Sequence, residues 1–107
     1  MKLTDVGEVI AERKLHLGGD EASRISILIG KPQPFDDGTG FYCPYQITGI
    51  DTEKVRWVGG VDAVQALEET LSVILPSVLA ELYMRYPGLQ WEQESAGDFG
   101  FRGRGNG

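Results

Sequence analysis

The spacing of apolar residues changes within residues 55–71, which read VRWVGGVDAVQALEETL. Up to Gly60 the residues alternate as in a strand, and this alternation predicts Val55 and Trp57 facing inward and Arg56 facing outward. From Gly60 onward the apolar residues recur three and four positions apart, which indicates an amphipathic helix. The stripe predicted to face the core consists of Val64, Leu67, Leu71, Ile74 or Leu75, Val78 and Leu82.

This helix has start and stop signals of its own. Asp62 suits the N-cap or the first turn, where exposed amide groups favour negative charge. Pro87 follows Tyr86 and ends the segment. Pro76 lies in the middle and lacks an amide hydrogen, so it either kinks the helix or splits it into two. We expect a kink, because an unbroken helix of this length would span ~36 Å and outrun a six-residue strand of ~20 Å.

Upstream of the helix, residues 9–17, 23–30 and 41–48 alternate as strands do. A Gly-rich turn joins the first two into a hairpin, and residues 31–40 read as a loop. Pro44 interrupts the third strand, which is therefore expected at a sheet edge or with a bulge. Residues 89–94 are a candidate fifth strand with Leu89 and Trp91 inward.

The pattern as a whole predicts an α+β fold. Four or five strands form a hairpin-rich antiparallel meander, and one long helix from the C-terminal half packs on one face. Residues 1–101 are expected to form a single domain, and residues 102–107 a disordered Gly/Arg tail.

Composition limits the function classes. The chain has 107 residues, of which 41% are apolar and 24% charged, as in one soluble domain. Its net charge is −6, and no Lys/Arg cluster occurs before residue 102, so nucleic acid is not an expected partner. Neither a signal peptide nor an apolar run of ~18 residues is apparent, so we expect a cytoplasmic protein without a membrane partner.

Catalytic chemistry finds little support in the sequence. A reactive cysteine needs a neighbouring base or cation, and a zinc site needs several His or Cys ligands. The chain has one cysteine and one histidine. The alternation places Cys43 on the inner face and His16 on an outer face, so Cys43 is expected to be buried and inert. No metal, cofactor or catalytic residue is predicted, and an enzymatic role is left open but not favoured.

Two sets of residues are candidates for binding. The first set comprises polar and aromatic side chains expected on the uncovered face of the sheet, which are types common at protein interfaces. These residues are Arg24, Tyr42, Gln46 and Arg56. The second set would form a pocket between sheet and helix. It consists of Arg13, Tyr45, Asp62 and Gln65.

The helix also carries a second apolar stripe beside the core stripe: Val73, Leu79, Tyr83 and Tyr86. Exposed, it would form a patch near the upper size found on soluble monomers. We predict a homodimer through this stripe, in the C-terminal half of the helix. The alternative is that residues 31–40, or Phe99 and Phe101, of the same chain cover it.

Four segments together resemble a family of small bacterial domains without an assigned function. Their order is an E-R-x-L strand at residues 12–15, G-[KR]-P-x-P at residues 30–34, C-P-Y-[QR]-I-x-G at residues 43–49 and G-V-D-A-V-Q-A-L at residues 60–67. The resemblance implies this fold and a bacterial origin, but no activity. The sequence thus favours a non-catalytic interaction module, with a small-molecule-binding or enzymatic domain as the alternative.

Overall fold

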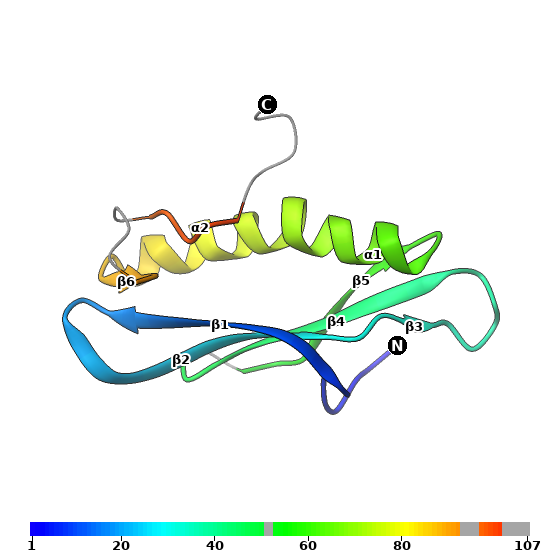
Figure 1. Cartoon of the computed structure of the whole chain (residues 1–107), viewed down its shortest axis with the longest axis horizontal. Helices are drawn as coiled ribbons and strands as arrows, with labels where there is room; N and C mark the ends of the chain where they lie inside the picture. Colours follow the sequence, from blue (N-terminus) through cyan, green and yellow to red (C-terminus); the bar gives the residue numbers. More distant parts are fainter. Residues whose placement is uncertain (51–52, 93–96, 102–107) are drawn as a thin grey trace.

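In the computed structural model, one antiparallel sheet carries a long helix on one of its faces (Figure 1). The structure describes residues 1–50, 53–92 and 97–101, with the backbone alone for residues 20–22. The strands are β1 (Val9–Leu17), β2 (Asp20–Gly30), β3 (Gln33–Pro34), β4 (Phe41–Thr48), β5 (Arg56–Gly60) and β6 (Leu89–Gln90). The helical elements are α1 (Ala63–Glu69), the π-helical turn η1 (Thr70–Ile74) and α2 (Leu75–Arg85).

The sheet is a meander with two short additions. β1 pairs with β2, β2 with β4 and β4 with β5, while β3 pairs with the start of β4 and β6 with the end of β1. All pairs are antiparallel, so the predicted α+β fold with one helix on one face is confirmed. The strand count rises to six because β3 and β6, of two residues each, join the sheet. The predicted fifth strand is confirmed for Leu89–Gln90 but does not include Trp91 and Glu92, and residues 93–94 lie outside the described residues.

The helix-facing side of β2 forms the centre of the core. Ile25, Ile27 and Ile29 are all buried, as their clean alternation predicts. Cys43 and Tyr45 of β4 are buried on the same side, where the helix covers them. A covered face opposite a polar one explains why the period-2 pattern was readable in these strands.

Pro44 lies in an interior strand, and not at a sheet edge, which was one of the two settings predicted for it. β4 pairs with β5 on one side and with both β2 and β3 on the other. On the second side, the pairing with β3 ends at Tyr42 and the pairing with β2 begins at Tyr45. Proline is tolerated here because the ladder is interrupted at Cys43 and Pro44.

The two faces of β5 are the reverse of the prediction. Residues directly opposite in an antiparallel pair share a face, and Arg56 lies opposite the buried Tyr45. Arg56 therefore faces the helix, and Trp57 lies on the outer face. Gly60 decides this register, because a Cβ there would lie 2.5 Å from the backbone nitrogen of Ala66. Only glycine fits against the helix at that distance, and period-2 alternation then brings Arg56 to the same side.

The buried line along the helix also differs from the predicted stripe. It consists of Ala66, Thr70, Leu75, Leu79 and Leu82. Val64, predicted to be in the core, is 71% exposed. The π-helical turn accounts for the spacing, because it adds one residue between Thr70 and Leu75 and so keeps the later leucines in line with the earlier ones.

Pro76 causes this irregularity. The helix continues from Ala63 to Arg85 without splitting. The amide of Leu75 donates to the carbonyl of Thr70, five residues back, in the turn directly before the proline. Pro76 then occupies the first turn of α2, where its missing amide hydrogen costs least. The disturbance expected at Pro76 thus takes the form of a π-turn inside one helix.

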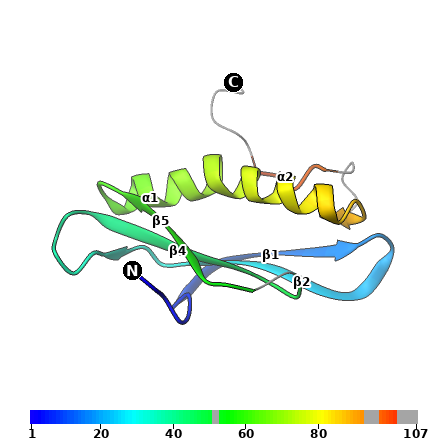
Figure 2. The same ribbon diagram turned by 180° about the vertical axis from the view of Figure 1, so that it is seen from behind.

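The N-terminal residues cross the outer face of the sheet, on the side opposite the helix (Figure 2). Val6 is buried there, and a Cβ on Gly30 would collide with its carbonyl oxygen and lie 2.7 Å from the Pro44 ring. The amide of Lys31 donates to the carbonyl of Glu8 at 2.8 Å. Part of the face expected to be uncovered is therefore covered by residues of the same chain.

The helix from Ala63 to Arg85 is long and apolar enough to cross a membrane, by length and composition alone. Core helices of soluble proteins share these properties, and this helix packs on the sheet through its buried line. The fold is compatible with a soluble protein.

Candidate functional site

An aromatic cluster lies on the outer face where β3, β4 and β5 meet. Phe35 lies 5.4 Å from Tyr42 and 5.5 Å from Trp57 between ring centroids, and Tyr42 lies 6.4 Å from Trp57. These spacings are typical of tilted and edge-to-face aromatic pairs. Trp57 remains 37% exposed, and its indole nitrogen donates to the carbonyl of Met1 at 3.2 Å. The cluster thus presents aromatic surface to solvent at one end of the sheet.

Three of the four residues predicted for the outer face lie there. Arg24, Tyr42 and Gln46 alternate with the buried residues of β2 and β4, whereas Arg56 faces the helix. Gln46 is held in place, because its side-chain nitrogen donates to the carbonyl of Glu53 at 2.7 Å. Sequence reasoning missed Phe35 and Trp57, which complete the cluster with Tyr42.

The edge of β5 next to this cluster is open. Among the described residues, β5 pairs with β4 and with no other strand. Val61, which directly follows β5, is 75% exposed. The outer edge of β5 thus has no strand partner in the described part of the chain, and the exposed Val61 side chain lies at its end.

The alternative set between sheet and helix does not converge. Asp62 and Gln65 cap the helix: Asp62 accepts from the amide of Gln65 at 2.8 Å, and Gln65 accepts from the amide of Val61 at 2.7 Å. Arg13 lies near the opposite edge of the sheet, between the rings of Trp91 and Phe101. The predicted N-cap at Asp62 is confirmed. Tyr45 lies apart from the other three residues of the set and contacts a different group of side chains.

These side chains surround a cavity of about 90 Å³ between the sheet and α2. The Tyr45 side chain lines it and is only 4% exposed. Three cations and one carboxylate contribute to the same lining: Lys54, Arg56, Arg85 and Glu81. Apolar side chains form the rest: Ile47, Ile50, Val78 and Leu82. Burial raises the pKa of the Tyr45 hydroxyl, and the positive charge of Arg56 opposes that shift.

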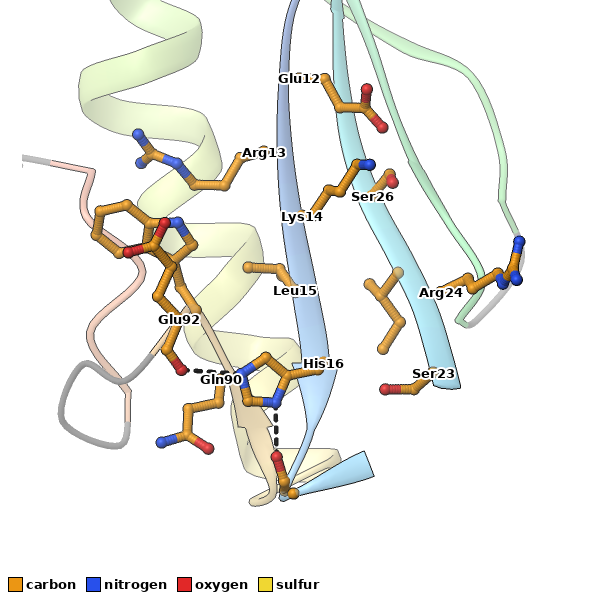
Figure 3. A pocket seen from close by; sticks show the side chains of 14 residues that line it. Glu12, Arg13, Lys14, Leu15, His16, Ser23, Arg24, Ser26, Gln90 and Glu92 are labelled. Carbon is orange, nitrogen blue, oxygen red and sulfur yellow. Dashed lines mark hydrogen bonds between the residues drawn. The ribbon is translucent and has the colours of Figure 1, made fainter. Parts of the chain in front are cut away.

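A wider, shallower hollow lies beside the β1–β2 hairpin (Figure 3). Arg13 points to the helix side of β1, whereas Glu12 and Lys14 point to the other side, so the lining does not converge. The His16 ring connects the hairpin turn to the segment after β6 through two polar contacts. Its Nδ1 lies 2.6 Å from the carbonyl oxygen of Gly18, and its Nε2 lies 2.9 Å from the carbonyl oxygen of Glu92. These contacts are structural, and we assign no site to the hollow.

Cys43 is fully buried, as predicted. Its sulfur lies 3.7 Å from the carbonyl oxygen of Gly30. Burial raises the pKa of the thiol, and a hydrogen bond with Thr70 opposes this shift. Since His16 is bonded elsewhere, the thiol has the environment of a small core residue and not that of a nucleophile.

The second helix stripe is largely covered by the same chain. Leu79 lies in the core with 1% exposure. Tyr83 packs edge-on against the buried Phe99, with 6.2 Å between ring centroids. This agrees with the expectation that C-terminal aromatics cover the stripe. The tail at residues 102–107 lies outside the described residues.

A family model with the description Domain of unknown function (DUF6968) matches residues 11–102. The chain belongs to this family. None of the curated proteins and none of the solved structures matches the chain. The DUF6968 match includes the aromatic cluster, β5 and the lining of the cavity at Tyr45, whereas Met1 and Val6 on the outer face precede it.

Proposed function

We propose that this DUF6968 domain is a non-catalytic interaction module that binds an extended segment of a partner polypeptide along the open edge of β5. The observation that carries the proposal is the aromatic cluster directly beside that edge. An added strand would gain main-chain hydrogen bonds, and its alternate side chains would contact the cluster. Exposed aromatic side chains are enriched where proteins bind partners.

The two long edges of the sheet differ in how they discourage strand addition. β1 carries the successive charged residues Glu12, Arg13 and Lys14, and β6 pairs with its end. Charged residues and covering segments are the usual protection of an edge. From Trp57 to Gly60, β5 contains neither a charge nor a proline. This contrast favours β5 as the binding edge.

Charge narrows the chemistry of the partner. Lys54 and Arg56 stand at the start of β5, and the chain as a whole has a net charge of −6. A segment with apolar residues at alternate positions would suit the cluster, and an acidic residue near Arg56 would complement the local charge. We place this module in the bacterial cytoplasm, where a reducing environment suits its single buried thiol.

A displayed library of random peptides tests the proposal and requires no identified partner. We expect selected peptides to shift the backbone amide NMR signals of β5 most, and to lose at least about tenfold in affinity when Trp57→Lys introduces a charge at the open edge. Val9→Lys is the matched control, because Val9 is similarly exposed, at 45%, on the opposite edge strand. Peptides that bind Trp57→Lys as tightly as the natural chain would refute the proposal.

Self-association through the second helix stripe is not included in this proposal. Leu79 is already buried and Tyr83 already packs on Phe99, so little of that stripe is left to a second copy. The alternative of a small-molecule-binding domain is favoured by a different observation, the cavity at Tyr45.

A further inference from the structure

The cavity at Tyr45 concentrates positive charge in an acidic protein. Three of the ten Lys and Arg residues line it, namely Lys54, Arg56 and Arg85. Glu81 is the one carboxylate among its described lining residues, so three positive charges and one negative charge leave a local excess of +2. The chain as a whole has a net charge of −6, so this sign reversal is local to the edge between β5 and α2.

The Tyr45 hydroxyl supplies a second, independent observation. It has no hydrogen-bond partner among the described residues. No fully enclosed side-chain oxygen or nitrogen in the described part of the chain lacks a partner, so this hydroxyl reaches solvent through the cavity. Burial keeps its pKa above the ordinary value, and the phenol therefore stays protonated at neutral pH and can donate a hydrogen bond. This hydroxyl reaches solvent and has no acceptor among the described residues, so a bound anion would accept its hydrogen bond in place of water.

The lining also sets the size and character of such an anion. Apolar side chains from β4, the following turn and α2 line the cavity, whereas the charged groups lie at exposed positions. Its volume of about 90 Å³ is several times the ~10–15 Å³ that one water molecule requires, which suits a small ligand. Guanidinium groups match the planar carboxylate group, and an alkyl chain suits the apolar lining.

We propose that this cavity binds a small monocarboxylate with a short alkyl chain. The carboxylate lies between Arg56 and the Tyr45 hydroxyl, and the alkyl chain lies against the apolar lining. This site lies on the helix side of the sheet and goes beyond peptide binding at the open edge, so it stands if that proposal fails.

Titration of the full chain with sodium butyrate at constant ionic strength tests this site. We expect saturable shifts of the amide NMR signals of Tyr45 and Arg56, with a Kd on the order of 1 mM. Butyramide has the same shape without the charge and should cause no saturable shift. If butyramide binds as well as butyrate, or if inorganic phosphate binds more tightly, the assignment to a monocarboxylate is wrong.

Variants separate the cavity from general attraction of anions to surface cations. Arg56→Gln should weaken butyrate binding by at least about tenfold, because it removes a charged hydrogen-bond donor. Tyr45→Phe should weaken it by about two- to tenfold while leaving the folded state at least as stable, because the lost hydroxyl has no hydrogen-bond partner among the described residues. Arg24→Gln, on the outer face of β2, is the matched control and should leave the Kd within about twofold. Equal weakening by Arg24→Gln and Arg56→Gln would overturn the proposal.

Discussion

Arg13 and Arg56 lie near opposite edges of the sheet, and both project from the face that carries the helix. Arg13 is enclosed: its guanidinium carbon lies 4.2 Å from the ring centroid of Trp91 and 4.6 Å from that of Phe101. It also donates to the carbonyl of Phe99 at 3.0 Å. Arg56 is exposed and makes no hydrogen bond or ion pair with any described residue.

This difference shows how the fold uses its two edges. On the β1 side, Arg13 stacks on the rings of Trp91 and Phe101 and donates to the backbone carbonyl of Phe99, so it holds the segment after β6 against the sheet. On the β5 side, no described segment returns, so Arg56, Trp57 and the Tyr45 hydroxyl are available to a ligand. The β1 edge therefore contributes mainly to stability, and the β5 edge is where binding is proposed.

The largest expected effect tests the close contact between Gly60 of β5 and the helix. Gly60→Ala places a Cβ 2.5 Å from the backbone nitrogen of Ala66, and the helix must move away from β5. We expect the free energy of unfolding to fall by about 3 kcal/mol in urea denaturation. Gly59→Ala is the matched control, because its Cβ would meet Phe35 at an ordinary 3.6 Å on the outer face. A Gly59→Ala variant that is as unstable as Gly60→Ala would show that the faces of β5 are wrongly assigned.

The second prediction compares the two arginines directly. Arg13→Ala removes two cation–π contacts and a charged hydrogen bond, which should lower the free energy of unfolding by about 2 kcal/mol. Arg56→Ala removes no contact of this kind and should change it by less than about 0.5 kcal/mol. Urea denaturation of both variants at neutral pH decides the matter. Similar losses for the two variants would mean that the β5 side is as closed as the β1 side.

The third prediction tests how well the core between the edges excludes ionised groups. Burial raises the pKa of the Cys43 thiol in the folded chain above its ordinary 9.0. The unfolded thiol ionises near pH 9 and the folded one only at higher pH, so the stabilisation from the buried neutral thiol is complete below pH 9 and decreases as the pH rises. Between pH 8 and 9.5 this contribution should fall, by at most roughly 0.8 kcal/mol.

Cys43→Ala serves as the reference for that prediction. The variant is less stable at every pH, but its free energy of unfolding should fall by less than that of the natural chain over the same interval, because it lacks the thiol. Urea denaturation at the two pH values measures both losses. If the two losses are equal, the thiol ionises as readily in the folded chain as in the unfolded one, and Cys43 is not shielded.

The sequence predicted what depends on neighbours along the chain. The isoleucines of β2, the cap at Asp62 and the stop at Pro87 are local patterns, and the structure confirms them. The faces of β5 were wrong because the strand is short and its apolar tryptophan suggested the core. The contact between Gly60 and α1, which sets the register, is a tertiary contact that the alternation of residues does not reveal. The only sequence signal for it is the glycine pair directly before the helix cap.

The candidate sites could be predicted only in part, for the same reason. Tyr45 was placed between sheet and helix, but Lys54 comes from a turn and Arg85 from the last turn of α2. No periodicity links these residues, so their convergence follows from the packing of α2 on β4. The enclosure of Arg13 by Trp91 and Phe101 was hidden likewise, because it joins β1 to residues at the far end of the chain.

The smallest expected effect is that of Trp57→Phe, in a comparison of the two tryptophans, one beside each edge. Trp57 is 37% exposed on the outer face, whereas Trp91 is half-buried under Arg13. Trp57→Phe keeps an aromatic ring in the cluster and should change the free energy of unfolding by no more than about 0.5 kcal/mol. Trp91→Phe loses part of its stacking surface with Arg13 and should cost about 1 kcal/mol.

Each variant also leaves a single tryptophan, so acrylamide quenching compares the edges directly. The chain that retains Trp57 should be quenched more strongly than the chain that retains Trp91, because collisions require exposed ring surface. Stronger quenching of Trp91 would mean that the C-terminal segment does not stay on the sheet in solution, and the contrast between a closed β1 edge and an open β5 edge would then fail.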